Sequence, residues 1–135
     1  MSESDQSILL DTSVLIDFAE VQSALPEEAD ASISAISLAE LAAGIHSSKD
    51  PVRQAERQLQ FRWVVQSFEP LVFDAETAHV YGSLAFLVEQ IGRKPRGRVA
   101  DLQIAATAVQ HALPLYTRNP DDFKGLGPLL NVIPV

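Results

Sequence analysis

Carboxylates recur in this sequence at the points where apolar, strand-like runs give way to helical patterns. Asp11 directly follows the apolar run 8–10 and precedes two hydroxyl residues. Three further acidic positions stand at comparable junctions: Glu40, Asp101 and the Asn-Pro-Asp-Asp stretch 119–122. Carboxylates that gather in one place repel one another unless a hard divalent cation neutralises them. The pattern therefore indicates metal-assisted chemistry on a phosphate as the leading hypothesis.

Helix capping is a competing structural explanation for Glu40 but not for Asp11. Ser37 to Glu40 has the form of a capping box, with Ser37 at the N-cap and Glu40 three residues later. That motif alone would account for Glu40. Asp11 is not needed as a cap, because Thr12 or Ser13 would serve equally well. A functional role is therefore favoured for Asp11, and both interpretations stay open for Glu40.

The later acids stand at predicted helix starts. Asp101 falls in the first turn of an alanine-rich helical pattern, where a carboxylate interacts favourably with the helix dipole. Asn119 and Pro120 predict a capped helix start that carries two acids in its first turn. Thr117 and Arg118 precede it at the end of a predicted strand, where they could orient a carboxylate or hold a phosphate.

Strand-like and helix-like patterns alternate along the chain. The sequence predicts short strands at 8–11, 31–35, 71–73, 114–117 and 131–133. Helices are expected at 13–20, 37–45, 51–68, 75–92 and 99–112, the fourth ending at Gly92. This alternation implies a parallel sheet covered by helices on both faces. Ligands of such sheets bind beyond the carboxyl ends of the strands, where the candidate acids fall.

The composition bounds the class of protein. With 135 residues, 47% of them hydrophobic, residues 1–135 are expected to form one domain with its own core. The absence of cysteine excludes disulfides and thiolate metal sites, so a metal must be held by oxygen or histidine. No apolar run is long enough to cross a membrane, and the polar, acidic first residues do not resemble a signal peptide. A cytoplasmic protein is therefore expected.

The charge is uneven along the chain. A net charge of −8 argues against broad, non-specific affinity for nucleic acid. Four of the ten basic side chains nevertheless lie within the segment 93–98 (Arg-Lys-Pro-Arg-Gly-Arg). That segment is either a solvated loop or an arm that contacts phosphate, and Asp101 three residues beyond it favours the arm. The surplus of acid elsewhere suits a basic protein partner.

Four segments together resemble the PIN domain, and more closely the VapC-type toxins of toxin–antitoxin pairs. They are Leu-Leu-Asp-Thr-Ser-Val-Leu-Ile-Asp (9–17), Ile-Ser-Leu-Ala-Glu-Leu (36–41), Val-Ala-Asp-Leu-Gln-Ile-Ala-Ala (99–106), and Leu-Tyr-Thr-Arg-Asn (115–119) with Asp-Phe (122–123). Their order and spacing extend over nearly the whole chain. The resemblance implies a PIN-like three-layer α/β/α fold around a mainly parallel sheet of about five strands. It also implies an endoribonuclease that depends on Mg²⁺ or Mn²⁺.

The resemblance assigns roles to individual residues. The acids expected to bind the metal ion are Asp11, Glu40 and Asp101. Asp122 is the best candidate for a fourth catalytic acid, because Asn119 is a neutral amide in a region where family members often have an acid. The residues expected to position carboxylates or waters are Thr12, Ser13, Thr117 and Asn119. The residues expected to contact RNA phosphates are Arg96, Arg98 and Arg118.

The resemblance also implies a reaction and partners. Hydrolysis would use a water activated at the metal site and would leave a 5′-phosphate and a 3′-hydroxyl. A VapB-like antitoxin that inserts a basic side chain among the acids is expected, as is a homodimer. The helical segment with Phe61, Trp63, Val64 and Val65 is either a groove wall for that partner or ordinary core.

Two other classes of function remain as alternatives. A phosphatase of the haloacid-dehalogenase type also has an aspartate after its first strand, but needs a second one two residues later, where this chain has Ser13. Such enzymes also use a later lysine, and none stands near the late acids. The second alternative is a binding module without catalysis, in which the acids only cap helices.

Overall fold

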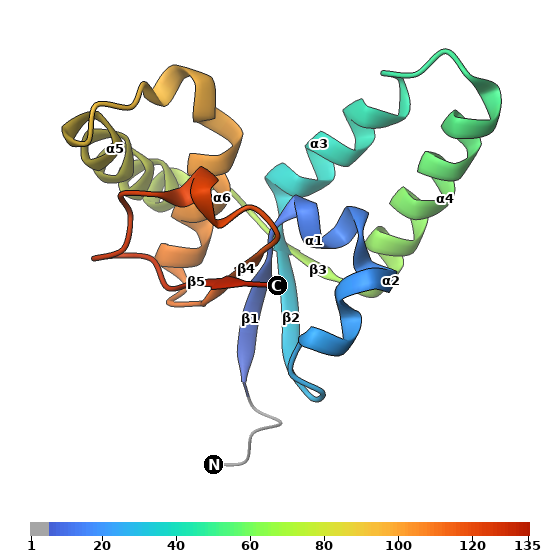
Figure 1. Ribbon diagram of the computed structural model, residues 1–135, viewed down its shortest axis with the longest axis horizontal. Coiled ribbons are helices and arrows are strands. Elements are labelled where there is room, and N and C mark those ends of the chain that lie inside the picture. The colour runs from blue at the N-terminus through green and yellow to red at the C-terminus, as the bar shows by residue number, and fades with distance from the viewer. Residues whose placement is uncertain (1–5) are drawn as a thin grey trace.

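The computed structural model describes residues 6–135 and builds them around one five-stranded sheet (Figure 1). The strands are β1 (Ser7–Leu10), β2 (Asp30–Ser34), β3 (Glu69–Leu71), β4 (Leu115–Thr117) and β5 (Val132–Pro134). They lie in the order β3-β2-β1-β4-β5, and every pairing is parallel. The predicted parallel sheet of five strands is therefore confirmed.

Helices cover both faces of the sheet. They are α1 (Thr12–Ile16), α2 (Phe18–Val21), α3 (Ala35–Ile45), α4 (Pro51–Ser67), α5 (Ala75–Gln90) and α6 (Val99–Gln110), with short 3-10 helices η2 (Gln22–Ala24), η3 (Pro95–Arg98) and η4 (Pro120–Phe123). In Figure 1, α5 and α6 lie to the left of β1 and β2, whereas α1 to α4 lie to the right. The hairpin of α3 and α4 projects away from the sheet. None of the helices in residues 6–135 is long and apolar enough to cross a membrane.

The central strand β1 joins two hydrophobic clusters, because successive side chains of a strand point to opposite faces. Leu9 packs in a cluster with buried residues of α5 and α6, among them Leu84. Ile8 and Leu10 point the other way and pack with residues of α1, α2 and α4, among them Val64. The strand is buried on both faces, which confirms the three-layer α/β/α arrangement.

Several helix boundaries follow from local chemistry as the sequence predicts. Asp50 caps α4 by accepting a hydrogen bond from the amide of Val52 at 3.1 Å, and Pro51 occupies the first turn. Asp74 caps α5 in the same manner. Gly92 follows α5 with φ of +81°, a conformation that favours glycine.

The predicted capping box of Ser37 and Glu40 is wrong. Helix α3 begins at Ala35, and its N-cap is Ser34, whose hydroxyl accepts a hydrogen bond from the amide of Ile36 at 3.0 Å. Strand β2 therefore passes into α3 without a loop. Both serines are of a residue type that caps helices, although only Ser37 has a Glu three residues later, and the extent of the strand decides between them. Glu40 consequently lies in the second turn of α3, where no cap requires it.

Three further boundaries differ from the prediction. The helix expected at 13–20 is interrupted at Asp17 and forms α1 and α2. Strand β3 lies two residues earlier than expected and includes Pro70, which an edge strand tolerates. The segment after Asn119 forms only the short η4, and the Asn119 side chain makes no capping hydrogen bond.

The aromatic residues near α4 belong mainly to the core. The ring of Trp63 packs edge-on against Phe68 with 5.5 Å between centroids, and tilted against Phe18 at 4.9 Å. Val64 is fully buried, whereas Val65 is half exposed. Core packing therefore accounts for Trp63 and Val64, and only the outer residues of this helix are free to face a partner.

Candidate active site

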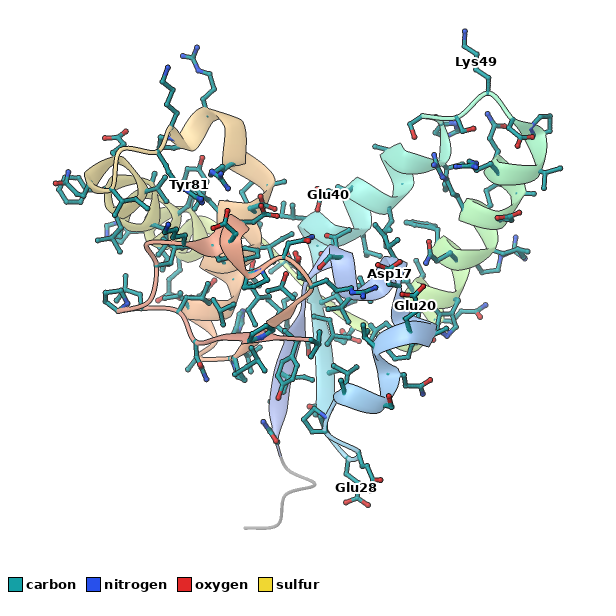
Figure 2. All side chains as sticks on the ribbon, in the orientation of Figure 1. Asp17, Glu20, Glu28, Glu40, Lys49 and Tyr81 are labelled. Carbon is teal, nitrogen blue, oxygen red and sulfur yellow. The ribbon has the colours of Figure 1, made fainter. Side chains whose placement is uncertain are left out.

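Three strand ends meet at one edge of the sheet, because β1 is paired in parallel with both β2 and β4. Asp11 follows β1 directly, and β2 runs into α3, which carries Glu40. Helix α6 contacts α3 and carries Asp101 in its first turn, and Asp122 follows β4 in η4. Figure 2 shows Glu40 at the notch between the two halves of the molecule. The fold therefore brings the four predicted acids to one side of the sheet.

Asp11 is held by hydroxyl groups although it is almost fully buried, with 5% of its surface exposed. Its Oδ2 accepts hydrogen bonds from Oγ of Ser13 at 2.7 Å and from Oγ1 of Thr117 at 2.8 Å. Every buried side-chain oxygen and nitrogen of the described residues has a hydrogen-bond partner. Oδ1 of Asp11, to which neither hydroxyl donates, therefore reaches solvent. The carboxylate is fixed through one oxygen and presents the other outward, as a metal ligand must.

The two hydroxyls are in turn held by the main chain after β4. Oγ of Ser13 accepts a hydrogen bond from the amide of Arg118 at 3.1 Å, and Oγ1 of Thr117 accepts one from the amide of Asn119 at 3.0 Å. Ser13 and Thr117 thus have the contacts expected of positioning residues. Asn119 contributes its amide rather than its side chain.

Glu40 is held by α1 across the edge of the sheet. The hydroxyl of Thr12 donates to Oε1 of Glu40 at 2.7 Å and lies 2.8 Å from Oγ of the buried Ser37. Ser37 was predicted as a cap, but its observed contact is with the residue that orients Glu40. Its role in the site depends on where α3 begins, which the local sequence does not reveal.

The pKa of Asp101 reflects its burial and the negative charge gathered around it. The pKa of Asp101 is raised from its ordinary value of 3.8 to about 6, and burial is the largest cause. The negative charges of Asp122, Asp11 and Glu40, in that order, contribute to the rise, whereas the charge of Arg98 opposes it. Acids scattered over a surface would not affect one another in this way. The crowding of carboxylates disfavours the ionised form of Asp101. A cation bound among them would offset their mutual repulsion.

The donor set suits a hydrated divalent ion. Carboxylate and hydroxyl oxygens are the ligands that Mg²⁺ and Mn²⁺ prefer. Among residues 6–135, no group of three or more acidic or histidine side chains stands close enough together to hold a metal ion by itself. Mg²⁺ usually keeps several waters and takes only one or two carboxylates directly. The open Oδ1 of Asp11 and the crowding around Asp101 therefore fit such an ion.

The basic segment 93–98 is attached to η4 beside the acids. Arg93 pairs with Asp121 at 3.1 Å, and Nη1 of Arg98 lies 3.8 Å from Oδ1 of Asp122. Arg96 is exposed and forms no ion pair with another described residue. The two contacts fix one side of the segment and leave Arg96 directed to solvent.

Arg118 has a different environment from the one predicted. Its Nη1 donates to Oδ2 of Asp17 at 2.7 Å and to Oε2 of Glu20 at 2.9 Å, and these two acids raise the pKa of Arg118. Figure 2 shows Asp17, at the break between α1 and α2, close to Glu20 of α2. The pairs connect the break between α1 and α2 to the end of β4. Because Nη1 donates to both acids, a phosphate contact by Arg118 would have to use its Nε or Nη2, against the negative charges of Asp17 and Glu20.

Comparison with known proteins agrees with this geometry. The model of the PIN domain family matches residues 8–127. Ribonuclease VapC from Rickettsia bellii (strain RML369-C) is 35% identical over 104 residues, which cover 76% of this chain and 75% of that protein. VapBC-5 from Mycobacterium tuberculosis, a member of the VapBC family of toxin–antitoxin systems, has a TM-score of 0.83 and 31% identity, covering 97% of this chain and 100% of the matched one. VapBC2 from Rickettsia felis, solved bound to a promoter DNA fragment, has a TM-score of 0.78 and 25% identity. The match covers 96% of this chain and 99% of the matched one. The predicted PIN-like fold is thereby confirmed.

The hydroxyl of Thr117 can be tested by substitution. Thr117→Val keeps the shape but removes the bond to Asp11 and leaves the amide of Asn119 without its acceptor. We expect the free energy of unfolding to fall by about 1–3 kcal/mol, the cost of unpaired buried polar groups. Urea denaturation measures it, with Thr117→Ser as the control that retains the hydroxyl. A Thr117→Val protein as stable as Thr117→Ser would contradict the role of this hydroxyl.

The raised pKa of Asp101 predicts a pH-dependent effect on stability. The folded state favours the protonated carboxyl, so the penalty for ionisation is absent below about pH 4 and complete above about pH 6. Asp101→Asn should therefore stabilise the metal-free protein at pH 8 and have little effect at pH 4. Because the side chain is partly exposed, the expected gain is about 1–2 kcal/mol.

Urea denaturation in EDTA at the two pH values measures this difference. Asp30→Asn, an exposed position at the opposite end of β2, is the control. An effect of Asp101→Asn that is the same at pH 4 and pH 8 would contradict the proposed crowding.

Proposed function

Because this chain belongs to the PIN domain family, we propose that it is a metal-dependent endoribonuclease and the toxin of a VapBC-type toxin–antitoxin pair. The observation that carries the proposal is the position of Asp11, Glu40 and Asp101 at the carboxyl edge of a parallel sheet, where hydroxyl groups hold Asp11 and Glu40. The relative from Rickettsia bellii is named a ribonuclease, which supports RNA as the substrate.

In this proposal Asp11 and Asp101 would bind the metal ion directly, and Glu40 would bind it through water or orient the attacking water. The chemistry that Mg²⁺ or Mn²⁺ supplies there is polarisation of the scissile phosphate and activation of a water. Ser13 and Thr117 hold Asp11 so that its second oxygen stays available. Crowding by its neighbours gives Asp101 an affinity for positive charge.

Glu40 and Asp122 complete the proposed chemistry. Thr12 binds one oxygen of Glu40, and the other oxygen is available to orient the attacking water. Asp122 acts as the fourth acid, with Arg98 moderating its charge. Attack by water on phosphorus with cleavage of the P–O3′ bond leaves a 5′-phosphate and a 3′-hydroxyl, and it needs no pair of histidines. Arg96 and Arg98 are proposed to contact the phosphates of the bound strand.

The proposal includes two protein partners. One is a VapB-like antitoxin, supported by structural neighbours that are VapBC toxin–antitoxin proteins. The net charge of −8 suits a basic segment of such a partner. The other is a second copy of the chain, for which the exposed Phe86 and Leu129 beside α5 provide an apolar surface.

The two alternative classes lack support in the observed contacts. Ser13 stands where a haloacid-dehalogenase phosphatase needs its acid, and its hydroxyl is bound to Asp11. A module in which the acids serve only as caps is not supported either. Asp11 makes no side-chain capping bond to α1, and Glu40 lies beyond the first turn of α3.

Cleavage assays test the proposal. Asp11→Asn and Asp101→Asn should each reduce Mg²⁺-dependent cleavage of total cellular RNA by more than the roughly 10- to 100-fold that loss of an outer partner of a metal ligand costs. Excess EDTA should abolish the activity of the unsubstituted protein. Asp30→Asn, at the far end of β2, should cleave normally.

Circular dichroism must show that both variants are folded. Full activity in excess EDTA, or in both aspartate variants, would refute the proposed function. Ligation-based mapping of the product ends would confirm or refute the expected 5′-phosphate.

A further inference from the structure

The surface beside Glu40 continues into a groove that lies between α1, α3 and α4. An inner hollow of about 340 Å³ is lined by Thr12, Glu40 and residues of α3 and α4. An outer hollow of about 490 Å³ adjoins it, because Ile16, Arg57 and Gln60 line both. Figure 2 shows Glu40 at the base of the α3–α4 hairpin and Lys49 at its tip. We call these two hollows together the hairpin groove.

The wall of the hairpin groove carries a guanidinium that is fixed but not neutralised. Nη1 of Arg57 donates to the carbonyl oxygen of Gly44 and to Oγ of Ser47, both at 2.7 Å. These bonds use one of its three nitrogens, and guanidinium has five N–H donors. Neither Arg57 nor Arg53, one helical turn earlier, forms an ion pair with any of residues 6–135. In a chain of net charge −8, two such cations side by side indicate a site for an anion.

The floor of the groove is apolar and fixed as well. Nε2 of Gln60 donates to the carbonyl oxygens of Leu15 at 3.1 Å and Ile16 at 3.0 Å, which attaches the end of α1 to α4. Ile16 is held there with 54% of its surface exposed. Leu41 adds a second apolar side chain to the inner hollow. A planar base or a ribose can rest on such a surface.

We infer that the hairpin groove binds the nucleotide next to the scissile phosphate of a single-stranded RNA. One hollow thus combines the carboxylate of Glu40, the apolar side chains of Ile16 and Leu41, and the guanidinium of Arg57. These groups suit a scissile phosphate with its metal ion, a nucleoside and a second phosphate. Arg57 binds that second phosphate and Arg53 the following one. This inference rests on the proposed function, because it takes the acidic site as the point of cleavage.

The signs of the charges favour RNA over a protein segment in this groove. A basic antitoxin segment suited to the acids would be repelled by Arg53 and Arg57, whereas an RNA strand carries a negative charge at every phosphate. Glu56 also lines the outer hollow and opposes an anion there. Arg57, held in the wall of both hollows, therefore contributes more to binding than Arg53.

Fluorescence anisotropy of a labelled, mixed-sequence RNA 12-mer in EDTA tests the inference without cleavage. Arg57→Gln and Arg53→Ala should each weaken binding about threefold to tenfold. Each should also lower the slope of log affinity against log salt by about 0.7, the value for one single-strand phosphate contact. Glu56→Gln should strengthen binding. Under cleavage conditions the arginine variants should raise KM with kcat nearly unchanged.

Arg62→Ala is the matched control. Arg62 lies on the same helix but borders a separate hollow with Phe61 and Val65, and its loss changes the net charge equally. Equal losses in the Arg62 and Arg57 variants would show a general charge effect and overturn the inference. Unchanged RNA affinity with Arg57→Gln would also overturn the inference. It would be overturned as well if a polyglutamate peptide displaced the RNA from the unsubstituted protein but not from the Arg57 variant.

The outcomes also separate this inference from the proposed function. Mg²⁺-dependent cleavage with RNA affinity independent of Arg53 and Arg57 would refute only the groove. RNA binding that depends on Arg53 and Arg57, without any cleavage, would refute the proposed nuclease activity. It would also remove the basis for placing the groove next to a scissile phosphate. Absence of both binding and cleavage would refute both.

Discussion

Mutual repulsion among carboxylates at one edge of the sheet is the constraint on which the rest of this structure depends. Burial and three neighbouring acids raise the pKa of Asp101, so the site is strained whenever it is fully ionised and empty of cations. The protein limits that cost with hydroxyl donors. Ser13 and Thr117 bind one oxygen of Asp11, and Thr12 binds one oxygen of Glu40. Each of these two carboxylates keeps its other oxygen free, so both can bind a divalent cation from solution.

The parallel sheet and its helices explain why these groups meet. Strands β1, β2 and β4 end at the same edge, and the chain leaves that edge in two directions (Figure 1). The α5–α6 half carries the basic segment with Arg96 and Arg98, whereas the α3–α4 half carries Arg53 and Arg57. The acids lie between these two basic surfaces. An extended anionic strand that contacts both would cross the acids, which connects the proposed chemistry with the inferred groove.

Local patterns in the sequence predict the parts of the site that depend on short segments. The run before Asp11 predicts a buried strand, and the alternation of elements predicts where its carboxyl end lies. The capping assignment of Ser37 is wrong, because β2 ends at Ser34, which is also a good capping residue, and the local pattern does not show where the strand ends. The ion pairs of Arg118 with Asp17 join residues 101 positions apart, which no local pattern encodes. The hairpin groove likewise exists only through tertiary packing of α1 against α4.

Calorimetric titration of the protein with Mn²⁺ at pH 6, where about half of Asp101 is protonated, tests the central claim most directly, because it measures binding of the ion rather than cleavage. We predict a saturable heat in the unsubstituted protein that is lost or strongly weakened in Asp101→Asn, together with release of protons as Asp101 gives up its raised affinity for them. A titration without saturable heat, or one that Asp101→Asn leaves unchanged, would contradict the claim that these carboxylates assemble to bind a divalent cation.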